Sequence, residues 1–498
     1  MNPTDPGIPL SSSPLGLFDQ QSDVGAVRHS GACTYDAASQ TYTIDGAGAN
    51  IWNDHDDFHF VWKQLTGDFI VTMQAEFVGQ GVNAHRKLGW MVRSSLATDA
   101  PNVSTSIHGD GLTSLQFRRT SGGKTEEIRA PITHADVIQL ERRGDAYIMS
   151  AARFGDPFTV VLVDDLALGD TLYVGLAVCS HEDDVVERAV FRNVRVVEPV
   201  QPGFVRGRDP LGSNLEILDV ASGQRQIIYR APEIFEAPNW TVDGRALIFN
   251  RGGLLFRFDL ASGDISQIDT GAVVQNNNDH VISFDGRMLA ISSRDDALKS
   301  SVIYTVPLTG GEPKRITAYG PSYLHGWSPD GQHLVYTAMR NGDFDIYRIA
   351  ADGGDDGAAE VQLTTAPGLD DGPEYTPDGQ TIYFNSVRSG LMQIWRMNAD
   401  GSNQQQVTDD EYNNWFPHVS PDGRWIAFLT YLVGEVEPSD HPPAKRVYLR
   451  LMATDGSAPP RIIAYLYGGQ GTMNVPSWAP DSRRLAFVSN SVTLHLAG

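Results

Sequence analysis

Histidine and carboxylate side chains recur at fixed distances before a repeated turn in the second half of the chain. The turn aspartates stand at positions 243, 285, 330, 378, 422 and 481. Seven residues before them lie Glu236, Asn278, Tyr323, Asp371, Trp415 and Asn474, and four to six residues before them lie Asp279, His280, His325, Glu374 and His418. Such residue types supply general acids and bases, ligands for divalent cations and hydrogen-bonding groups for hydroxyls.

This polar cluster allows three interpretations. In the first, Tyr323 and Trp415 stack on the ring faces of an oligosaccharide or another polyhydroxylated small molecule, and the Asn, Asp and Glu side chains bind its hydroxyls. In the second, a subset of the cluster binds a divalent cation such as Ca²⁺, Mn²⁺ or Zn²⁺. In the third, the polar side chains satisfy one another around a water-filled channel. The candidate metal ligands are His280, His325, His418, Glu374 and Asp279.

If the cluster is catalytic, we expect His280 or His325 as the base and Asp371 or Glu374 as its acid partner. Two carboxylates with separated pKa values suit glycoside hydrolysis. A histidine base beside an arginine or a metal suits β-elimination instead. The sequence contains no Walker loop, no G-x-G-x-x-G after a strand, no H-E-x-x-H and no G-x-S-x-G, so it gives no sign of these other chemistries.

An insertion precedes the last turn, because 59 residues separate its aspartate at 481 from the one at 422. Long loops in compact domains tend to be functional or disordered. Residues 431–445 contain His441 beside two prolines, with basic residues following, which indicates a lid that contacts a carboxylate-bearing substrate; a solvated loop with incidental charge fits equally well. The expected substrate-binding residues are Glu236, Asn278, Asp279, Tyr323, Trp415, His418, His441, Lys445, Arg450, Gln470 and Asn474.

The elements that position these residues follow from the repeat. Ser-Pro-Asp-Gly suits a type I turn, and each copy continues with a short apolar strand, an alternating strand such as Gln393-Ile-Trp-Arg-Met397, and a strand that ends in Thr. Four strands per copy and a period near 45 residues predict one propeller blade per copy, six in all. Too few residues follow the sixth turn for a full blade, so we expect 214–220 and 226–229 to supply its outer strands and close the ring.

These repeats resemble the TolB-type β-propeller over roughly residues 205–490. The Pro-Asp-Gly turns and the Asp345-Ile-Tyr347 strand carry the resemblance. It implies a six-bladed propeller over 213–498, preceded by a linker over 199–212. A propeller brings the starts of its innermost strands together at one mouth of the central channel, which places the polar cluster there. The fold specifies no function by itself.

Residues 14–198 lack the repeat and show alternating strands with Gly and Asp between them, typical of a β-sandwich. The order Trp62-Lys, Gly67-Asp-Phe69 and Gly89-Trp-Met-Val-Arg93 resembles the concanavalin-like sandwich domains of carbohydrate-active proteins. The chain is therefore expected to be all-β, with a concanavalin-like sandwich before the propeller. A basic set around Arg86, Arg93 and Arg118 forms either a sugar- or carboxylate-binding face or an interface with the propeller.

The composition of the chain restricts the kinds of partner and the cellular location that we expect. With 38 Lys and Arg against 61 Asp and Glu, the formal net charge is −23, which argues against binding nucleic acid. No stretch reaches the ~18–20 apolar residues of a membrane span. The start, Met1 to Gly7, lacks the features of a secretory signal, so we expect a cytoplasmic protein, or a periplasmic one if a leader has been removed. Cys33 and Cys179 are expected to be free thiols, with a disulfide as the alternative.

Two functions follow as expectations. In the first, the protein binds and cleaves an oligosaccharide at the channel mouth, as a glycoside hydrolase or polysaccharide lyase, and the sandwich helps to bind the glycan. TolB-like repeats also occur in the oligogalacturonate lyase family, where propeller histidines bind a metal, but the histidines here do not reproduce that spacing. In the second, the resemblance to TolB implies a non-catalytic scaffold that binds a protein partner's peptide or a glycan.

Overall fold

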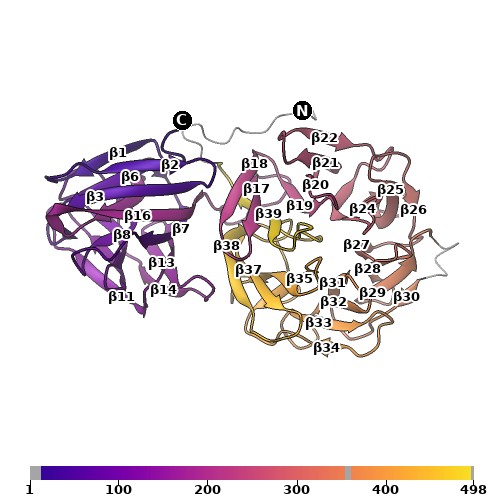
Figure 1. Cartoon of the computed structure of the whole chain (residues 1–498). Helices are drawn as coiled ribbons and strands as arrows, with labels where there is room; N and C mark the ends of the chain where they lie inside the picture. The colour runs from indigo at the N-terminus through magenta and orange to yellow at the C-terminus, as the bar shows by residue number, and fades with distance from the viewer. Residues whose placement is uncertain (1–12, 354–359, 495–498) are drawn as a thin grey trace. The chain divides into compact units, whose positions relative to one another are not determined.

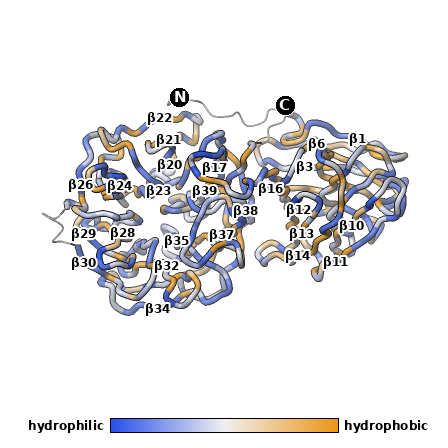
Figure 2. Tube along the Cα trace, turned by 180° about the vertical axis from the view of Figure 1, so that it is seen from behind, coloured by the Kyte–Doolittle hydropathy of each residue, from blue (hydrophilic) through white to orange (hydrophobic). Residues whose placement is uncertain are grey.

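The computed structural model describes residues 13–353 and 360–494, so the opening segment Met1 to Gly7 lies outside the described residues. All the regular elements assigned in the described part are β-strands. None of the described residues forms a helix long and apolar enough to cross a membrane. The described residues divide into two compact units, an N-terminal domain (13–202 with 492–494) and a propeller (203–491). Figures 1 and 2 show the strands of both units and the alternation of hydrophobic and hydrophilic residues along them.

Two seven-stranded antiparallel sheets build the N-terminal domain. The first contains, in spatial order, β1 (Gln20–Val24), β6 (Phe58–Thr66), β15 (Thr171–Cys179), β8 (Lys87–Arg93), β9 (Asn102–His108), β10 (Leu112–Arg118) and β11 (Glu126–Thr133). The second contains β14 (Thr159–Val163), β13 (Ala146–Ala152), β12 (Val137–Arg143), β7 (Phe69–Phe77), β16 (Glu182–Val197), β3 (Thr41–Gly48) and β2 (Ala32–Asp36). A short pair, β4 (Ile51–Trp52) and β5 (His55–Asp56), stands apart.

One hydrophobic core joins the two sheets. Trp90 and Val92 of β8 and Val71 of β7 belong to the same buried cluster. Because side chains alternate along a strand, β8 turns Lys87, Met91 and Arg93 to the opposite face. The alternating pattern is therefore confirmed as strands in two packed sheets, whereas the concanavalin-like classification stays a prediction. Both cysteines are buried and free.

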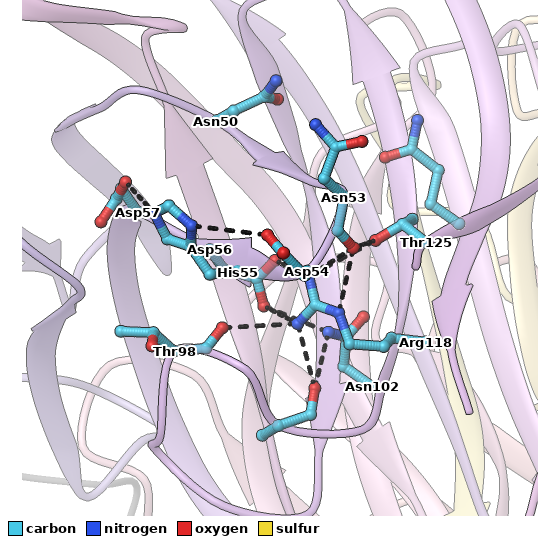
Figure 3. A network of polar contacts seen from close by, with 12 residues as sticks. Asn50, Asn53, Asp54, His55, Asp56, Asp57, Thr98, Asn102, Arg118 and Thr125 are labelled. Atoms are coloured by element: carbon cyan, nitrogen blue, oxygen red, sulfur yellow. Dashed lines mark hydrogen bonds and ion pairs between the residues drawn. The ribbon is translucent and has the colours of Figure 1, made fainter. Parts of the chain in front are cut away.

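A buried ion-pair network occupies the outer face of the first sheet (Figure 3). The Arg118 guanidinium donates to both carboxylate oxygens of Asp56, at 2.7 and 2.9 Å, and Arg93 lies 3.5 Å from the same carboxylate. All three side chains are fully buried. Arg86 is also buried and pairs with Glu187 at 2.6 Å. These arginines pair with carboxylates of their own domain, and their part in a ligand-binding face or an interface with the propeller stays a prediction.

In the described residues of the propeller, six sheets form the blades. The first five are β19 (Phe235–Trp240), β20 (Ala246–Arg251), β21 (Leu254–Asp259) and β22 (Ile265–Ile268); β23 (Asn276–Ile282), β24 (Met288–Asp295), β25 (Ser300–Pro307) and β26 (Lys314–Arg315); β27 (Ser322–Trp327), β28 (His333–Met339), β29 (Phe344–Ala350) and β30 (Val361–Gln362); β31 (Asp370–Tyr375), β32 (Thr381–Ser386), β33 (Gln393–Asn398) and β34 (Gln405–Gln406); and β35 (Asn413–Val419), β36 (Trp425–Tyr431), β37 (Lys445–Ala453) and β38 (Arg461–Gly468). The first strand of each of these five blades is innermost, and the outer strands β22, β26, β30 and β34 lie at the periphery (Figure 1).

The sixth blade joins the two ends of the propeller, as the sequence predicts. Strand β39 (Arg484–Ser491) pairs along its whole length with β17 (Gly212–Asp219), which in turn pairs with β18 (Arg225–Ala231). A bridge between Trp478 and Leu485 marks the inner edge of this blade. The blade thus combines strands from opposite ends of the unit.

The repeated aspartates build the turns between the first two strands of each blade. In the first copy, Asp243 Oδ1 accepts from Thr241 Oγ1 at 2.6 Å and from the backbone N–H of Arg245 at 3.0 Å. Gly244 follows with φ +70°, a conformation that favours glycine. Asp285, Asp330, Asp378 and Asp422 accept from a Ser or Thr two residues earlier in the same way. The recurring acidic residue is therefore structural.

Candidate functional site

Irregular pairing at the start of each inner strand positions the polar cluster. The register shifts between Glu236 and Asn239 in β19, between Asn276 and His280 in β23, between Leu324 and Gly326 in β27, between Asp371 and Glu374 in β31, and between Trp415 and His418 in β35. Such bulges leave residues unpaired, bend the strand and redirect side chains. The residues on these bulges gather at the end of the channel where the inner strands begin, called the channel mouth below.

The backbone is left-handed at equivalent points of three of these bulges. Ala237, Gly372 and Phe416 each lie six residues before a turn aspartate, with φ of 56°, 62° and 54°. At Gly372 a side chain would also collide, because its Cβ would lie 2.6 Å from Asn385 Oδ1. Glycine is therefore required where the chain turns directly after Asp371.

An ion pair between His325 and Asp371 lies at the channel mouth. His325 Nε2 is 3.1 Å from Asp371 Oδ1, and both side chains are almost fully buried. The same oxygen accepts from Thr337 Oγ1 and from the backbone N–H of Gly372, both at 2.8 Å. Burial would raise the pKa of Asp371, but His325 and His441 outweigh it and lower that pKa to about 2. Burial would likewise lower the pKa of His325, yet Asp371 and Asp279 raise it.

Asp279 is a second buried carboxylate beside this pair. Its Oδ2 accepts from Asn277 Nδ2 at 2.8 Å, while its backbone N–H donates to Asn277 Oδ1 at 3.0 Å. Burial raises the pKa of Asp279 to about 6, with a further contribution from the negative charge of Asp371 and an opposing one from His325. The mouth thus holds one carboxylate that is ionised at all ordinary pH values and one that is protonated in mild acid.

A third carboxylate, Glu236, pairs with Arg206 of the segment that precedes the first blade. Arg206 also donates to Gln470 Oε1 at 3.1 Å, and Asn474 Oδ1 accepts from the backbone N–H of Gly471 at 2.6 Å. Burial raises the pKa of Glu236 despite the positive charge of Arg206. Glu236 and Arg206 line a cavity of about 920 Å³ that also reaches Asn277.

The insertion brings His441 to the mouth, where it covers Trp415. The two rings stack at 4.3 Å with an interplanar angle of 16°, and Trp415 is fully buried. Pro442 holds the insertion in place, because its carbonyl accepts from Tyr431 Oη at 2.8 Å and from the backbone N–H of Gln470 at 3.3 Å. The prediction that Trp415 stacks on a ligand is therefore wrong, since His441 already occupies its face; burial lowers the pKa of His441.

Glu374 and His418 hold neighbouring blades together. Glu374 Oε1 accepts from the backbone N–H of Val419 at 2.9 Å, and its Oε2 lies 2.6 Å from His418 Nδ1. The other ring nitrogen of His418 contacts the Met473 carbonyl at 3.1 Å. Asn239, at the position of Glu374 in the first blade, accepts from the backbone N–H of Ile282 in the same way. These polar atoms are thus used between blades, and the catalytic role of Glu374 and the ligand-binding role of His418 stay predictions.

The remaining predicted residues divide into those that lie away from the mouth, which are His280, Arg450 and Lys445, and those that lie at it, which are Asn278 and Tyr323. His280 turns its Nε2 towards the Ile248 carbonyl at 3.3 Å, and burial lowers its pKa to about 4, so the ring is neutral. Arg450 donates to Asp410 Oδ2 at 2.6 Å. Lys445 begins β37, the third strand of its blade. Asn278 is buried at the mouth with Nδ2 unbonded, and Tyr323 is half-buried beside Phe344.

The predicted metal ligands are not assembled into a metal site. His325 pairs with Asp371, His418 pairs with Glu374, and His280 faces a backbone carbonyl. Across residues 13–353 and 360–494, no group of three or more His, Cys, Asp or Glu side chains is arranged to hold a metal ion. The described residues therefore do not fit the predicted Ca²⁺, Mn²⁺ or Zn²⁺ site.

Three residues of the mouth escape sequence reasoning. Arg206 belongs to the predicted linker, Thr337 to a second strand, and Asn277 stands one residue before the column that defines the site. A signal for Asn277 exists in the run Asn276-Asn-Asn-Asp-His280, which places consecutive polar residues on one bulge. Arg206 and Thr337 have no such signal, because the packing of one blade on the next brings Thr337 to Asp371 and the closed ring brings Arg206 to Gln470.

Three comparisons place the propeller among known proteins. The family model described as the TolB beta propeller domain matches residues 325–437. A protein of Agrobacterium fabrum, described as "Uncharacterized protein Atu1656", is 45% identical over 278 residues, which cover 55% of this chain and 92% of the relative. A solved structure from Agrobacterium tumefaciens whose description names TolB shares 44% identity with a TM-score of 0.53, covering 56% of this chain and 98% of that one. TolB from Acinetobacter baumannii is more distant, at 18% identity and a TM-score of 0.41, covering 52% and 64%.

Proposed function

The chain belongs to the family of TolB-like β-propeller proteins, and from this premise we propose that its channel mouth binds an oligosaccharide or another polyhydroxylated molecule and cleaves it by acid–base chemistry. One observation carries the proposal. Two buried carboxylates, Asp279 and Asp371, interact through His325, and their pKa values lie at about 6 and about 2. Two carboxyl groups whose pKa values differ in this way can serve as a general acid and as a permanently ionised partner.

The binding part of the proposal rests on the mixture of polar groups at the mouth. Asn277, Tyr323 and Gln470 add amide and phenol groups to the three carboxylates, and Arg206 adds a cation beside Glu236. Sugar hydroxyls both donate and accept hydrogen bonds, so they match such a mixture better than a purely apolar or a uniformly charged ligand does. The cavity of about 920 Å³ next to Glu236 falls within the ~300–1,000 Å³ range of small-molecule sites.

The cleavage part assigns one role to each carboxylate. Protonated Asp279 donates its proton to the leaving glycosidic oxygen as the C–O bond breaks. Ionised Asp371, held by His325 and Thr337, stabilises the positive charge that develops on the anomeric carbon. Water then adds to that carbon, and its proton returns to Asp279, so the step is a hydrolysis with no other reactant.

The test uses Asp279→Asn and Asp371→Asn with a panel of neutral and acidic oligosaccharides. Calorimetric titration measures binding, and release of new reducing ends measures cleavage. We expect Asp279→Asn to retain binding within about threefold and to lose at least about 100-fold in turnover, the usual contribution of a general acid. The matched control is Asp264→Asn, which makes the same change at an exposed turn. Wild-type protein that binds none of the panel would refute the proposal, and binding without cleavage would leave the scaffold function instead.

We also propose that the N-terminal domain is a concanavalin-like module that assists glycan binding. The face of the first sheet away from the core carries linked polar side chains: Ser106 Oγ donates to Gln116 Oε1 at 3.2 Å, and Gln116 Nε2 donates to Glu127 Oε1 at 3.0 Å. Glu127 is the partly exposed end of this row of bonds, and we expect Glu127→Ala in the full chain to weaken binding of a long oligosaccharide and not of a disaccharide. Equal affinities of wild type and variant for both lengths would refute this role.

A further inference from the structure

A second cavity lies at the other end of the inner strands, where they run into the Asp-Gly turns. It has a volume of about 290 Å³ and is called the turn-end cavity below. Its walls are the apolar residues three positions before the turn aspartates, and its rim is formed by the residues directly before them. The walls comprise Trp240, Ile282, Trp327, Tyr375, Val419 and Trp478, and the rim comprises Val242, Phe284, Pro377, Pro421 and Pro480.

Most side-chain polar groups around this cavity are already bonded within the protein, and the exception is the indole N–H of Trp240, which is buried without a partner in the described part of the chain. The indole N–H groups of Trp327 and Trp478 donate to the carbonyls of Val281 and His418, both at 2.9 Å. Asn239 is bonded to the next blade and to the Pro476 carbonyl at 2.6 Å, and Glu374 is bonded to Val419 and His418 as described above. A ligand here therefore gains mainly apolar contact, and the indole N–H of Trp240 can donate one hydrogen bond to it.

The rim is exposed although it is apolar. Val242 and Phe284 are 50% and 42% exposed, and they stand at equivalent positions of the first two turns. Exposed apolar side chains that lead into an apolar cavity indicate a binding site more strongly than scattered ones do. About half of the Val242 side chain and a little less of the Phe284 side chain are therefore left uncovered by the described part of the chain.

The rim also discriminates between kinds of ligand. Three of its residues are prolines, which have no backbone N–H, and the turn carbonyls of Thr241 and Ser420 are used by the N–H groups of Gly244 and Gly423, both at 2.8 Å. A peptide would leave its amides without partners there. We therefore propose that the turn-end cavity binds a small, uncharged molecule with an aromatic or other apolar ring system. The site is independent of the chemistry proposed for the channel mouth.

The experiment uses the full chain and N-phenyl-1-naphthylamine, an uncharged probe whose fluorescence rises in apolar surroundings. We expect saturable binding of the probe, with displacement by naphthalene. N-acetyltryptophanamide, which carries an aromatic ring and two amides, should displace it at least tenfold less effectively. Equal displacement by the amide would overturn the choice of a small apolar ligand over a peptide side chain.

Two variants locate the probe. Val419→Trp places in the fifth blade the residue that three other blades carry at this position, so the fold should tolerate it while the new ring fills the cavity. We expect it to weaken probe binding at least about tenfold, because the new ring occupies the space that the probe needs, and to leave oligosaccharide cleavage unchanged. Phe284→Ser acts at the exposed rim and should weaken binding about threefold, for roughly 30 Å² of lost apolar contact.

The control is again Asp264→Asn, which should bind the probe as the wild type does. Unchanged probe affinity in both Val419→Trp and Phe284→Ser would overturn the proposal, as would a wild type that shows no saturable binding. If Val419→Trp does not fold, Phe284→Ser decides the question alone, because Phe284 is 42% exposed and belongs to none of the buried hydrophobic clusters of the described residues.

Discussion

Replacing Asp279 by Asn should stabilise the propeller at neutral pH, although Asp279 is central to the proposed site. Burial raises the pKa of this carboxyl from its ordinary 3.8 to about 6, so the folded protein holds the proton more tightly than the unfolded chain does. At 1.36 kcal/mol for each tenfold change in proton affinity, the difference between a pKa of 3.8 and one of about 6 corresponds to a penalty of about 3 kcal/mol for the ionised form at pH 7 and above. Asparagine carries no charge, and its side-chain oxygen can still accept from Asn277.

The sign of the effect depends on pH in a defined way. A raised carboxyl pKa contributes stability that is fully present below pH 3.8 and is lost as the pH rises to about 6. The wild type should therefore match Asp279→Asn near pH 3.5 and fall behind it by up to about 3 kcal/mol at pH 8. His325 and Asp371 titrate in both proteins, so most of their effect cancels in the comparison.

Calorimetric unfolding of the full chain at pH 3.5, 5, 6.5 and 8 measures this difference. Asp264→Asn serves as the control and should differ from the wild type by less than about 0.5 kcal/mol at every pH, as exposed substitutions usually do. A variant at Asp279 that is less stable than the wild type at pH 8, or more stable by the same amount at pH 3.5 and pH 8, would refute the assignment of Asp279 as a destabilising buried acid.

Three further predictions concern other buried charges. Asp56→Ala should destabilise the N-terminal domain by about 3–5 kcal/mol, because it leaves two buried guanidinium groups without a counter-charge; urea unfolding of the full chain measures this, and a loss below about 1 kcal/mol would contradict it. Glu374→Gln should cost about 1 kcal/mol and Glu374→Ala about 2–3 kcal/mol, since glutamine can still accept from the next blade; equal losses in the two variants would show that the bond to that blade contributes nothing. Asp371→Asn should cost up to about 2.5 kcal/mol above pH 4, from a pKa lowered from 3.8 to about 2, and this cost should fade as the pH falls towards 2; stability curves recorded from pH 2 to pH 6 check it, and a cost that does not change over this range would be the contrary result.

Local signals explain why the propeller could be predicted from sequence. The Ser/Thr-x-Asp-Gly turn is bonded within five residues of itself, as Asp243 shows, and each blade repeats it. The partnership of residues 214–220 with the last strand also followed, because the repeat leaves one blade incomplete. Arguments from period and turn chemistry therefore recover the strands and their order.

The candidate site was predicted less completely, because its contacts join distant segments. The column before the turns correctly placed Asp371, His325 and Asp279 at one end of the channel. It did not show that Glu374 is used by Val419, 45 residues later in the chain, or that His441 covers Trp415. Residue type alone cannot distinguish a carboxylate that bonds a neighbouring blade from one that faces the channel, since both stand on the same bulge.

The pairing of β17 with β39 sets the order in which the propeller can be completed. These strands are separated by the five other blades, and register partners such as Leu215 and Val488 are more than 270 residues apart in the chain. During synthesis the first five blades can form one after another, but the ring stays open until residue 491 has been made. Such a long-range contact forms late and at a high entropic cost. We therefore expect the pairing of β17 with β39, which completes the sixth blade, to be the last step of folding. A substitution that weakens this seam would therefore accelerate opening of the whole ring.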